Sequence, residues 1–324
     1  MKITQIDVFR VNYKLLNHKY AWSRGQAVTF FISTIISIST DEGLKGFTEV
    51  CPLGPAYLDA DDRGVPSGIE EIGRHLIGRD PRQINLINDL MDYALGGHNY
   101  VKSPLNIACW DILGKTTGTP LCTLLGGQTM EKYPLYRTIS QGSPKKMADD
   151  VACYREEGYL RFQLKVGGVP YDDIKRMIAV IKNLQVGDIL VADANTGWLP
   201  HEALRVANAL AGEDIYLEQP CSSLEECCMV RDQTQLPMVL DEIIRDINSL
   251  MRAYSQRAMN VVNLKISRVG GLTKAKQRRD LCESLGLAMT IEDSWGGDIT
   301  TAIIAHLVGS TKPGYYFTST DFNS

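Results

Sequence analysis

Short apolar segments alternate with helical segments from Tyr133 onward, and this alternation constrains the fold more than any other feature of the sequence. The helical segments carry boundary signals, such as Ser143 and Pro144 before "KKMADDVACYREE" and Gly158 after it. The alternation predicts βαβ units with right-handed crossovers and parallel strands. The apolar segments are "YPLYRTI", "LRFQLK", "DILVAD", "DIYLE", "PMVLD", "VVNLK", "LAMTIED" and "YYFTSTD". Eight strands can close a (β/α)8 barrel, although residues 133–321 are few for that fold and require short loops.

The sequence before Tyr133 is organised differently, with strands first and helices after them. Strand composition is found in "ITQIDVFRVNYKL", "TFFISTIISISTDEG" and "KGFTEVCPL". Helical patterns follow in "SGIEEIGRHLIG", with Ser67 as the N-cap, in "QINLINDLMDYALGG", and in "SPLNIACWDILGKTTG", with Pro104 in the first turn and Gly118 at the end. This order indicates an α+β unit. We therefore predict an α/β protein with an α+β domain over residues 1–126 and a TIM-like (β/α)8 barrel domain over residues 127–324.

The composition excludes several classes of function. The 324 residues are 44% hydrophobic and 22% charged, as in a soluble globular protein with a substantial core. A net charge of −4 provides no basic surface for nucleic acid, and the apolar runs are too short to span a membrane. The eight cysteines form no CxxC pair and the five histidines show no ligand spacing. This pattern favours reduced thiols, a cytoplasmic location and no histidine-based metal site.

Five successive predicted strands end in a charged residue: Lys165, Asp193, Glu218, Asp241 and Lys265. In a closed barrel these ends form a ring at the C-terminal mouth, where active sites of this fold lie. An occasional Asp at a strand end is explained by turns, in which its short side chain hydrogen-bonds the nearby backbone. It does not explain a Glu or two lysines that each follow an apolar strand.

The three carboxylates of this ring suit a hard cation, because Mg²⁺ prefers oxygen ligands and retains positions for water or substrate oxygens. Without a metal, adjacent carboxylates would repel one another and raise one another's pKa. The alternative is that Lys165 and Lys265 neutralise the carboxylates as a salt-bridge network. The two lysines flank the carboxylates, however, so a substrate chelated by the metal would lie between two ammonium groups.

This arrangement suits the removal of a weakly acidic proton next to a carboxylate. Mg²⁺ would stabilise the ene-diolate, and a lysine could act as the base if burial and a neighbouring cation lowered its pKa. With these residues the chain resembles the enolase superfamily, in its muconate-lactonizing and mandelate-racemase-like group. The resemblance runs nearly end to end. It implies that residues 1–126 cap the barrel, that Asp193, Glu218 and Asp241 bind Mg²⁺, and that Lys165 and Lys265 form the acid–base pair.

The chain departs from the family pattern in three places. Many members carry Lys-x-Lys at the end of the second strand, where this chain has Gln163 before Lys165. Dipeptide epimerases commonly carry Asp-x-Asp at the eighth strand, where only Asp321 is found. Similar proteins usually continue beyond the position of Ser324, so a further C-terminal segment is expected.

A narrower likeness lies in "QLKVGG", "LEQPCSSLEE", "IEDSWGGDI", "EVCPLGPAY" and "GGHNYVKS". These segments resemble the branch that acts on proline derivatives, which includes cis-3-hydroxy-L-proline dehydratases and hydroxyproline-betaine 2-epimerases. The resemblance implies that Trp295 faces the ring nitrogen, as an indole attracts an ammonium group, and that Asp293 adds a counter-charge. Alternatively, Trp295 packs above the barrel and Asp293 caps a turn. In the loop "NHKYAWSRGQAV", Trp22 and Arg24 are candidate substrate contacts, and Trp22 could equally anchor the loop to its own domain.

The resemblance favours an Mg²⁺-dependent lyase that dehydrates cis-3-hydroxy-L-proline to Δ1-pyrroline-2-carboxylate. Lys165 would be the base for an L substrate and Lys265 the general acid. Epimerisation or racemisation of proline, hydroxyproline or their betaines is the first alternative, and dipeptide epimerisation the second. A class I aldolase and an inactive binding protein are remoter readings. We expect a homo-oligomer with a small carboxylate substrate and no nucleic-acid or membrane partner.

Overall fold

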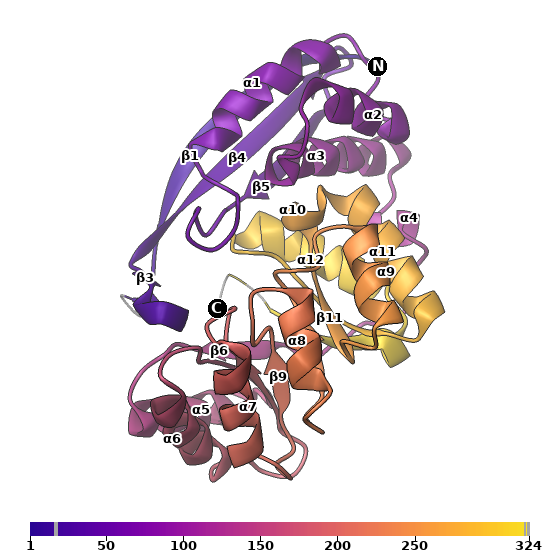
Figure 1. Cartoon of the computed structure of the whole chain (residues 1–324). Helices are drawn as coiled ribbons and strands as arrows, with labels where there is room; N and C mark the ends of the chain where they lie inside the picture. The colour runs from indigo at the N-terminus through magenta and orange to yellow at the C-terminus, as the bar shows by residue number, and fades with distance from the viewer. Residues whose placement is uncertain (16–18, 321, 323–324) are drawn as a thin grey trace.

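The computed structural model describes residues 1–15, 19–320 and 322. The N-terminal part forms an elongated layer of sheet and helices, and the remaining chain lies beneath it (Figure 1). The sheet contains β1 (Ile3–Lys14), β4 (Phe30–Thr40) and β5 (Lys45–Val50) in the antiparallel order β1-β4-β5. Between β1 and β4, a small hairpin of β2 (Tyr20–Ala21) and β3 (Ala27–Val28) encloses the short helix η1 (Ser23–Gly25).

Three helices cover the sheet, α1 (Gly64–Leu76), α2 (Ile84–Ala94) and α3 (Asn99–Thr117), and their apolar side chains form one core with Ile36 and Ile38. Two predicted helix starts are wrong. The buried stripe of α1 already begins at Val65, so the helix starts before Ser67, which is not its N-cap. Val101 likewise extends the buried face of α3 toward its start, so Pro104 lies inside the helix and not in its first turn.

The rest of the chain confirms the predicted alternation, with eight parallel strands in the order β13-β12-β11-β10-β9-β8-β7-β6. The strands are β6 (Tyr136–Ile139), β7 (Arg161–Lys165), β8 (Ile189–Asp193), β9 (Tyr216–Glu218), β10 (Met238–Leu240), β11 (Val261–Lys265), β12 (Ala288–Glu292) and β13 (Tyr316–Ser319). The Tyr316 hydroxyl at the start of β13 donates to the carbonyl of Pro134, just before β6, at 2.6 Å. The sheet is therefore nearly closed into the expected barrel.

Helices connect the barrel strands and bury their apolar faces against the sheet, with Phe162, Leu190 and Ile291 in the shared core. They are α4 (Leu121–Leu124), which precedes the barrel, α5 (Pro144–Glu156), α6 (Pro170–Ile181), α7 (Pro200–Ala209), α8 (Leu224–Arg231), α9 (Ile247–Ser255), α10 (Ile266–Val269), α11 (Leu272–Leu285) and α12 (Asp298–Gly309); η2 (Pro313–Tyr315) precedes β13. Ser143 caps α5 by accepting from the Lys146 amide, as predicted. Within the described chain, no helix has the length and apolar character needed to cross a membrane.

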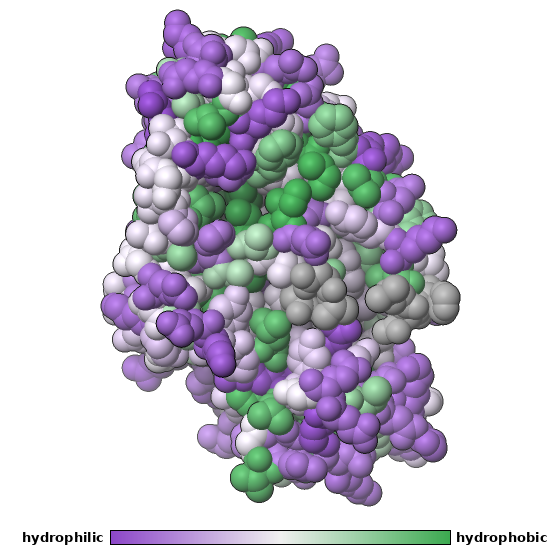
Figure 2. Space-filling view, turned by 180° about the vertical axis from the view of Figure 1, so that it is seen from behind, coloured by the Kyte–Doolittle hydropathy of each residue, from purple (hydrophilic) through white to green (hydrophobic). Residues whose placement is uncertain are grey.

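The N-terminal layer and the barrel share buried polar contacts. Asn106 of α3 donates to the Thr273 hydroxyl of α11 at 2.8 Å and accepts from the Thr273 amide at 3.1 Å. Glu49 of β5 reaches the start of α12, where its Oε2 accepts hydrogen bonds from the amides of Gly297 and Thr300. On the face shown in Figure 2, apolar side chains gather in the middle of the molecule, while both ends are largely hydrophilic.

Replacing Glu49 with Gln should destabilise the protein, because α12 has no side-chain cap of its own and Glu49 places a buried carboxylate at the helix N-terminus. We expect a loss of about 1–3 kcal/mol in the free energy of unfolding. Urea denaturation measures this loss, with the exposed Glu70→Gln as the control. Equal midpoints for the two variants would contradict the inter-domain capping role.

Candidate active site

Six consecutive strands, β7 to β12, deliver a charged side chain to the same mouth of the barrel. Lys165 is in register with Asp193, Asp193 with Glu218, and Lys265 with Glu292, while Asp241 directly follows β10. The structure thus brings together the five residues singled out in the sequence, and their exposed fractions lie between 0% and 7%. Parallel strands place their C-terminal ends on one side, which is why the spacing along the chain becomes proximity in space.

Each lysine of this ring forms an ion pair with a neighbouring aspartate. The Lys165 ammonium lies 2.5 Å from Asp193 Oδ2, and the Lys265 ammonium lies 2.9 Å from Asp241 Oδ2. A second cation, Arg268 of α10, lies 2.7 Å from Asp241 Oδ1. The salt-bridge network considered as an alternative from the sequence is therefore present.

These ion pairs correct one expectation about the lysines. Burial is the largest single influence on the pKa of Lys165 and lowers it, but Asp193, Tyr20 and Glu218 together raise it more, so the net shift is upward. Burial also lowers the pKa of Lys265, and Asp241, Glu292 and Glu242 together raise it above its ordinary value. The lowered lysine pKa expected from the sequence is not found in this arrangement, because the nearest charge to each lysine is a carboxylate and not a cation.

Glu218 is the carboxylate between the two ion pairs, and its own partners are neutral. Gln163 donates to Oε2 at 3.0 Å and Asn263 donates to Oε1 at 2.5 Å. Burial, together with Asp193 and Asp241, raises the pKa of Glu218 well above its ordinary value. Where many members of the family have the first lysine of Lys-x-Lys, this chain therefore has Gln163, whose neutral amide donates a hydrogen bond to Glu218.

No set of three acidic, histidine or cysteine side chains in the described residues is arranged to hold a metal ion. The ion pairs give the physical reason, since Asp193 and Asp241 each turn toward a cationic side chain. The neighbouring Glu242 also carries a buried carboxyl, whose pKa is raised to about 8 by burial and by Asp241 and Asp193. Among the described residues, the barrel mouth therefore contains buried carboxyl groups, those of Glu218 and Glu242, that form no ion pair with a lysine or arginine.

The loop between β5 and α1 places Tyr57, a residue that was not predicted to be part of the site, at the ring of charged strand ends. The Tyr57 hydroxyl donates to Asp241 Oδ2 at 2.8 Å and accepts from the Lys265 ammonium at 2.5 Å. No periodicity or charge pattern marks Tyr57, because its role depends on a contact between two distant parts of the chain. Glu292 was also missed, although it stands at a strand end immediately before Asp293.

Asp293 and Trp295 lie next to the ring. Asp293 accepts hydrogen bonds from the amide of Ser267 at 2.9 Å and from the amide of Ser294 at 2.7 Å. These are the contacts of a residue that caps a turn, which was the alternative to a role as a counter-charge. Burial raises its pKa to about 6. The Trp295 indole stacks on Phe31 at 3.9 Å between ring centroids and meets Tyr20 edge-on at 5.1 Å.

The loop that carries Trp22 and Arg24 rests on the mouth of the barrel. Arg24 donates to the carbonyl of Thr196 at 2.7 Å, and Ser23 donates to the carbonyl of Asn195 at 3.2 Å. Trp22 is only 5% exposed, and its ring centroid lies 5.6 Å from that of Tyr20 in the same loop. Asp321, the aspartate that the sequence offers near the eighth strand, lies outside the described residues.

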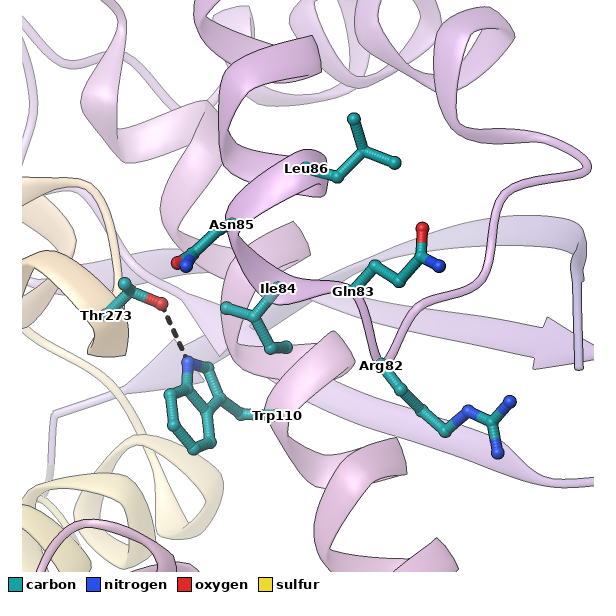
Figure 3. A pocket seen from close by; sticks show the side chains of 7 residues that line it. All are labelled: Arg82, Gln83, Ile84, Asn85, Leu86, Trp110 and Thr273. Atoms are coloured by element: carbon teal, nitrogen blue, oxygen red, sulfur yellow. Dashed lines mark hydrogen bonds between the residues drawn. The ribbon is translucent and has the colours of Figure 1, made fainter.

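An open hollow of about 420 Å³ lies elsewhere, where the N-terminal layer meets the barrel. Its wall includes Arg82, Ile84 and Trp110, whose indole nitrogen donates to the Thr273 hydroxyl (Figure 3). None of the residues that line this hollow belongs to the ring of charged strand ends. We therefore place the candidate active site at the ring, where the reactive groups are.

A capped barrel with acids and lysines on successive strand ends defines a class of enzyme, and comparison with known families agrees. "Enolase C-terminal domain-like" matches residues 146–323, and "Mandelate racemase / muconate lactonizing enzyme, N-terminal domain" matches residues 5–126. The chain belongs to the mandelate racemase/muconate lactonizing enzyme family of the enolase superfamily.

The chain is also similar to individual proteins of this family. Cis-3-hydroxy-L-proline dehydratase of Roseibium aggregatum is 55% identical over all of this chain and 88% of its own length. N-succinyl-L-Arg/Lys racemase of Bacillus cereus is 28% identical over 96% of this chain and 85% of its own. A mandelate racemase/muconate lactonizing enzyme of Roseovarius nubinhibens, crystallised with magnesium, is 34% identical over 99% of this chain and 88% of its own, with a TM-score of 0.96.

Proposed function

We propose that this protein dehydrates cis-3-hydroxy-L-proline to Δ1-pyrroline-2-carboxylate with the help of Mg²⁺. The observation that carries the proposal is the pair of buried lysines, Lys165 on β7 and Lys265 on β11, on either side of an acidic trio. The dehydratase relative at 55% identity favours this substrate. The enzyme class follows from the family, and the roles of individual residues are part of the proposal.

We propose that Asp193, Glu218 and Asp241 hold the metal, because the chemistry of this donor set fits Mg²⁺. All three offer carboxylate oxygens, and Glu218 is a buried acid with neutral partners whose pKa is raised by its two neighbours. Asp193 and Asp241 would have to exchange their ammonium and guanidinium partners for the cation. A bound Mg²⁺ would supply the positive charge that stabilises negative charge developing on the substrate carboxylate.

The two lysines would divide the proton transfers between them. If Asp193 held the metal, Lys165 would lose the strongest of the charges that raise its pKa, while burial would continue to lower it. Lys165 would take the α-proton, and the C2–H electron pair would form the C2=C3 bond. The C3–O bond would break as Lys265 protonates the hydroxyl, which leaves as water. The enamine would then tautomerise to the imine.

Aromatic side chains would enclose the substrate ring. Trp295 lies beside Tyr20 and Phe31, both from the capping layer, and an indole face attracts a desolvated ammonium group by about 2 kcal/mol. We propose Trp295 as the contact for the ring nitrogen, with Asp293 as a nearby negative charge and Trp22 as the support of this aromatic wall.

The proposal is tested by incubating the protein with Mg²⁺ and cis-3-hydroxy-L-proline and trapping the imine with o-aminobenzaldehyde. We expect coloured product that requires both the 3-hydroxyl and the metal. Racemases and epimerases among the relatives make 2-epimerisation of proline, hydroxyproline or their betaines the second candidate. Turnover of those compounds without imine formation would favour it.

A further inference from the structure

The two lysines at the barrel mouth have unequal surroundings, although the sequence presents them as a pair. Among the described residues, Asp193 is the only carboxylate within ion-pair distance of Lys165. Lys265 lies near two carboxylates, with Asp241 Oδ2 at 2.9 Å and Glu292 Oε1 at 3.5 Å. Lys265 and Glu292 are in register on β11 and β12. The second carboxylate is therefore built into the sheet.

Glu292 is itself held firmly in place. Its side chain is almost fully buried, and the Tyr136 hydroxyl from β6 donates to Oε2. Asn263 of β11 donates to Oε1 at 3.2 Å and also holds Glu218. Fixed hydrogen bonds of this kind keep a buried carboxylate in one orientation.

This inference rests on the proposed function, in which Asp193, Glu218 and Asp241 hold Mg²⁺. The number of carboxylates near each lysine becomes important in that state. Lys165 would then lose Asp193, its one carboxylate partner, while Lys265 would lose Asp241 and retain Glu292. We propose that Glu292 is a positioning residue that holds the Lys265 amine where it delivers a proton to the leaving hydroxyl. Glu292 thereby makes the two lysines non-equivalent and supports elimination, which needs Lys265 at the C3 oxygen.

The inference predicts that Glu292→Gln separates the two proton transfers. Dehydration of cis-3-hydroxy-L-proline should fall about tenfold or more, part of the 100- to 10,000-fold that a positioned acid contributes. Exchange of the α-hydrogen of the L substrate in D₂O needs only Lys165 and should stay within about twofold of the wild type. Equal losses of both reactions, or unchanged dehydration, would overturn the inference.

Two further variants make the comparison sharper. Tyr136→Phe removes one hydrogen bond to Glu292 but leaves its charge, so a smaller loss in the same direction is expected. Glu283→Gln breaks a Glu–Lys ion pair of 3.2 Å with Lys312, outside the barrel mouth, and should change neither reaction.

A measurement without substrate keeps the inference separate from the proposed reaction. Reductive methylation of the Mg²⁺-saturated protein, mapped by peptide mass spectrometry, reports how firmly each amine is paired. Wild-type Lys165 should be methylated faster than Lys265, and Glu292→Gln should reduce the difference. Equal labelling in the wild type would overturn the inference. Unequal labelling in a protein that makes no imine would support the pairing of Glu292 with Lys265 but reject the proposed reaction.

Discussion

Replacing Lys165 with Met is expected to abolish exchange of the α-hydrogen of cis-3-hydroxy-L-proline in D₂O and to abolish dehydration with it. The substitution retains an unbranched side chain that is one atom shorter and removes the amine that would take the proton. A positioned base contributes about 100- to 10,000-fold, so both rates should fall by that factor. Lys165 is buried against Asp193, so the variant also leaves that carboxylate without its ammonium partner.

The measurement is proton NMR of the α-position, with imine formation followed in parallel. Lys175→Met on the exposed face of α6 is the matched control and should retain both rates. A decisive comparison is Lys265→Met, which should lose dehydration but retain exchange from the L substrate. If Lys165→Met exchanges at the wild-type rate, Lys165 is not the base for this substrate.

The second large effect is expected for Glu218→Gln, which should eliminate the stabilisation of the protein by Mg²⁺. A ligand that binds only the folded state at 100 times its Kd adds about 2.7 kcal/mol to the free energy of unfolding. The wild type should therefore show a rise in Tm with Mg²⁺, and the variant should show little or none. The exposed Glu213→Gln should behave as the wild type.

Without Mg²⁺ the sign of the effect should reverse. The pKa of Glu218 is raised in the folded protein, first by burial and then by Asp193 and Asp241, so the folded state holds this proton more tightly than the unfolded chain. The stability that Glu218 contributes is then complete below its unfolded pKa and is lost as the pH rises above it. At neutral pH, metal-free Glu218→Gln should be at least as stable as metal-free wild type. A variant less stable than the wild type under these conditions would contradict the account of Glu218.

The barrel and its ring of charges could be predicted because both depend on regular local patterns. Each strand is an apolar run that ends in a charged residue, and parallel pairing brings those ends together whatever the connecting helices contain. Lys165, Asp193 and Glu218 were therefore found from the sequence alone. The starts of α1 and α3 were misplaced, because buried stripes that begin at Val65 and near Val101 outweighed the signals of Ser67 and Pro104.

The contacts that tune the ring could not be predicted, since they join residues far apart in the chain. Tyr57 reaches Lys265 across 208 positions of sequence, and Glu49 reaches Gly297 across 248. The pairing of Lys165 with Asp193 follows from their register, but its effect on the lysine pKa depends on burial that only the folded structure reveals. Glu292 is the exception, because the strand-end pattern would have found it if applied to one more unit.

The hydrogen bonds from α12 to Glu49 bear on attempts to alter substrate range by recombining halves of different homologues. A chimera that joins a foreign capping segment to this barrel would leave the first turn of that helix without its acceptor unless the donor carries an equivalent acid. Trp295 lies just before this turn, so a mismatched graft would disturb its stacking with Phe31 and Tyr20 before any residue of the barrel mouth was redesigned.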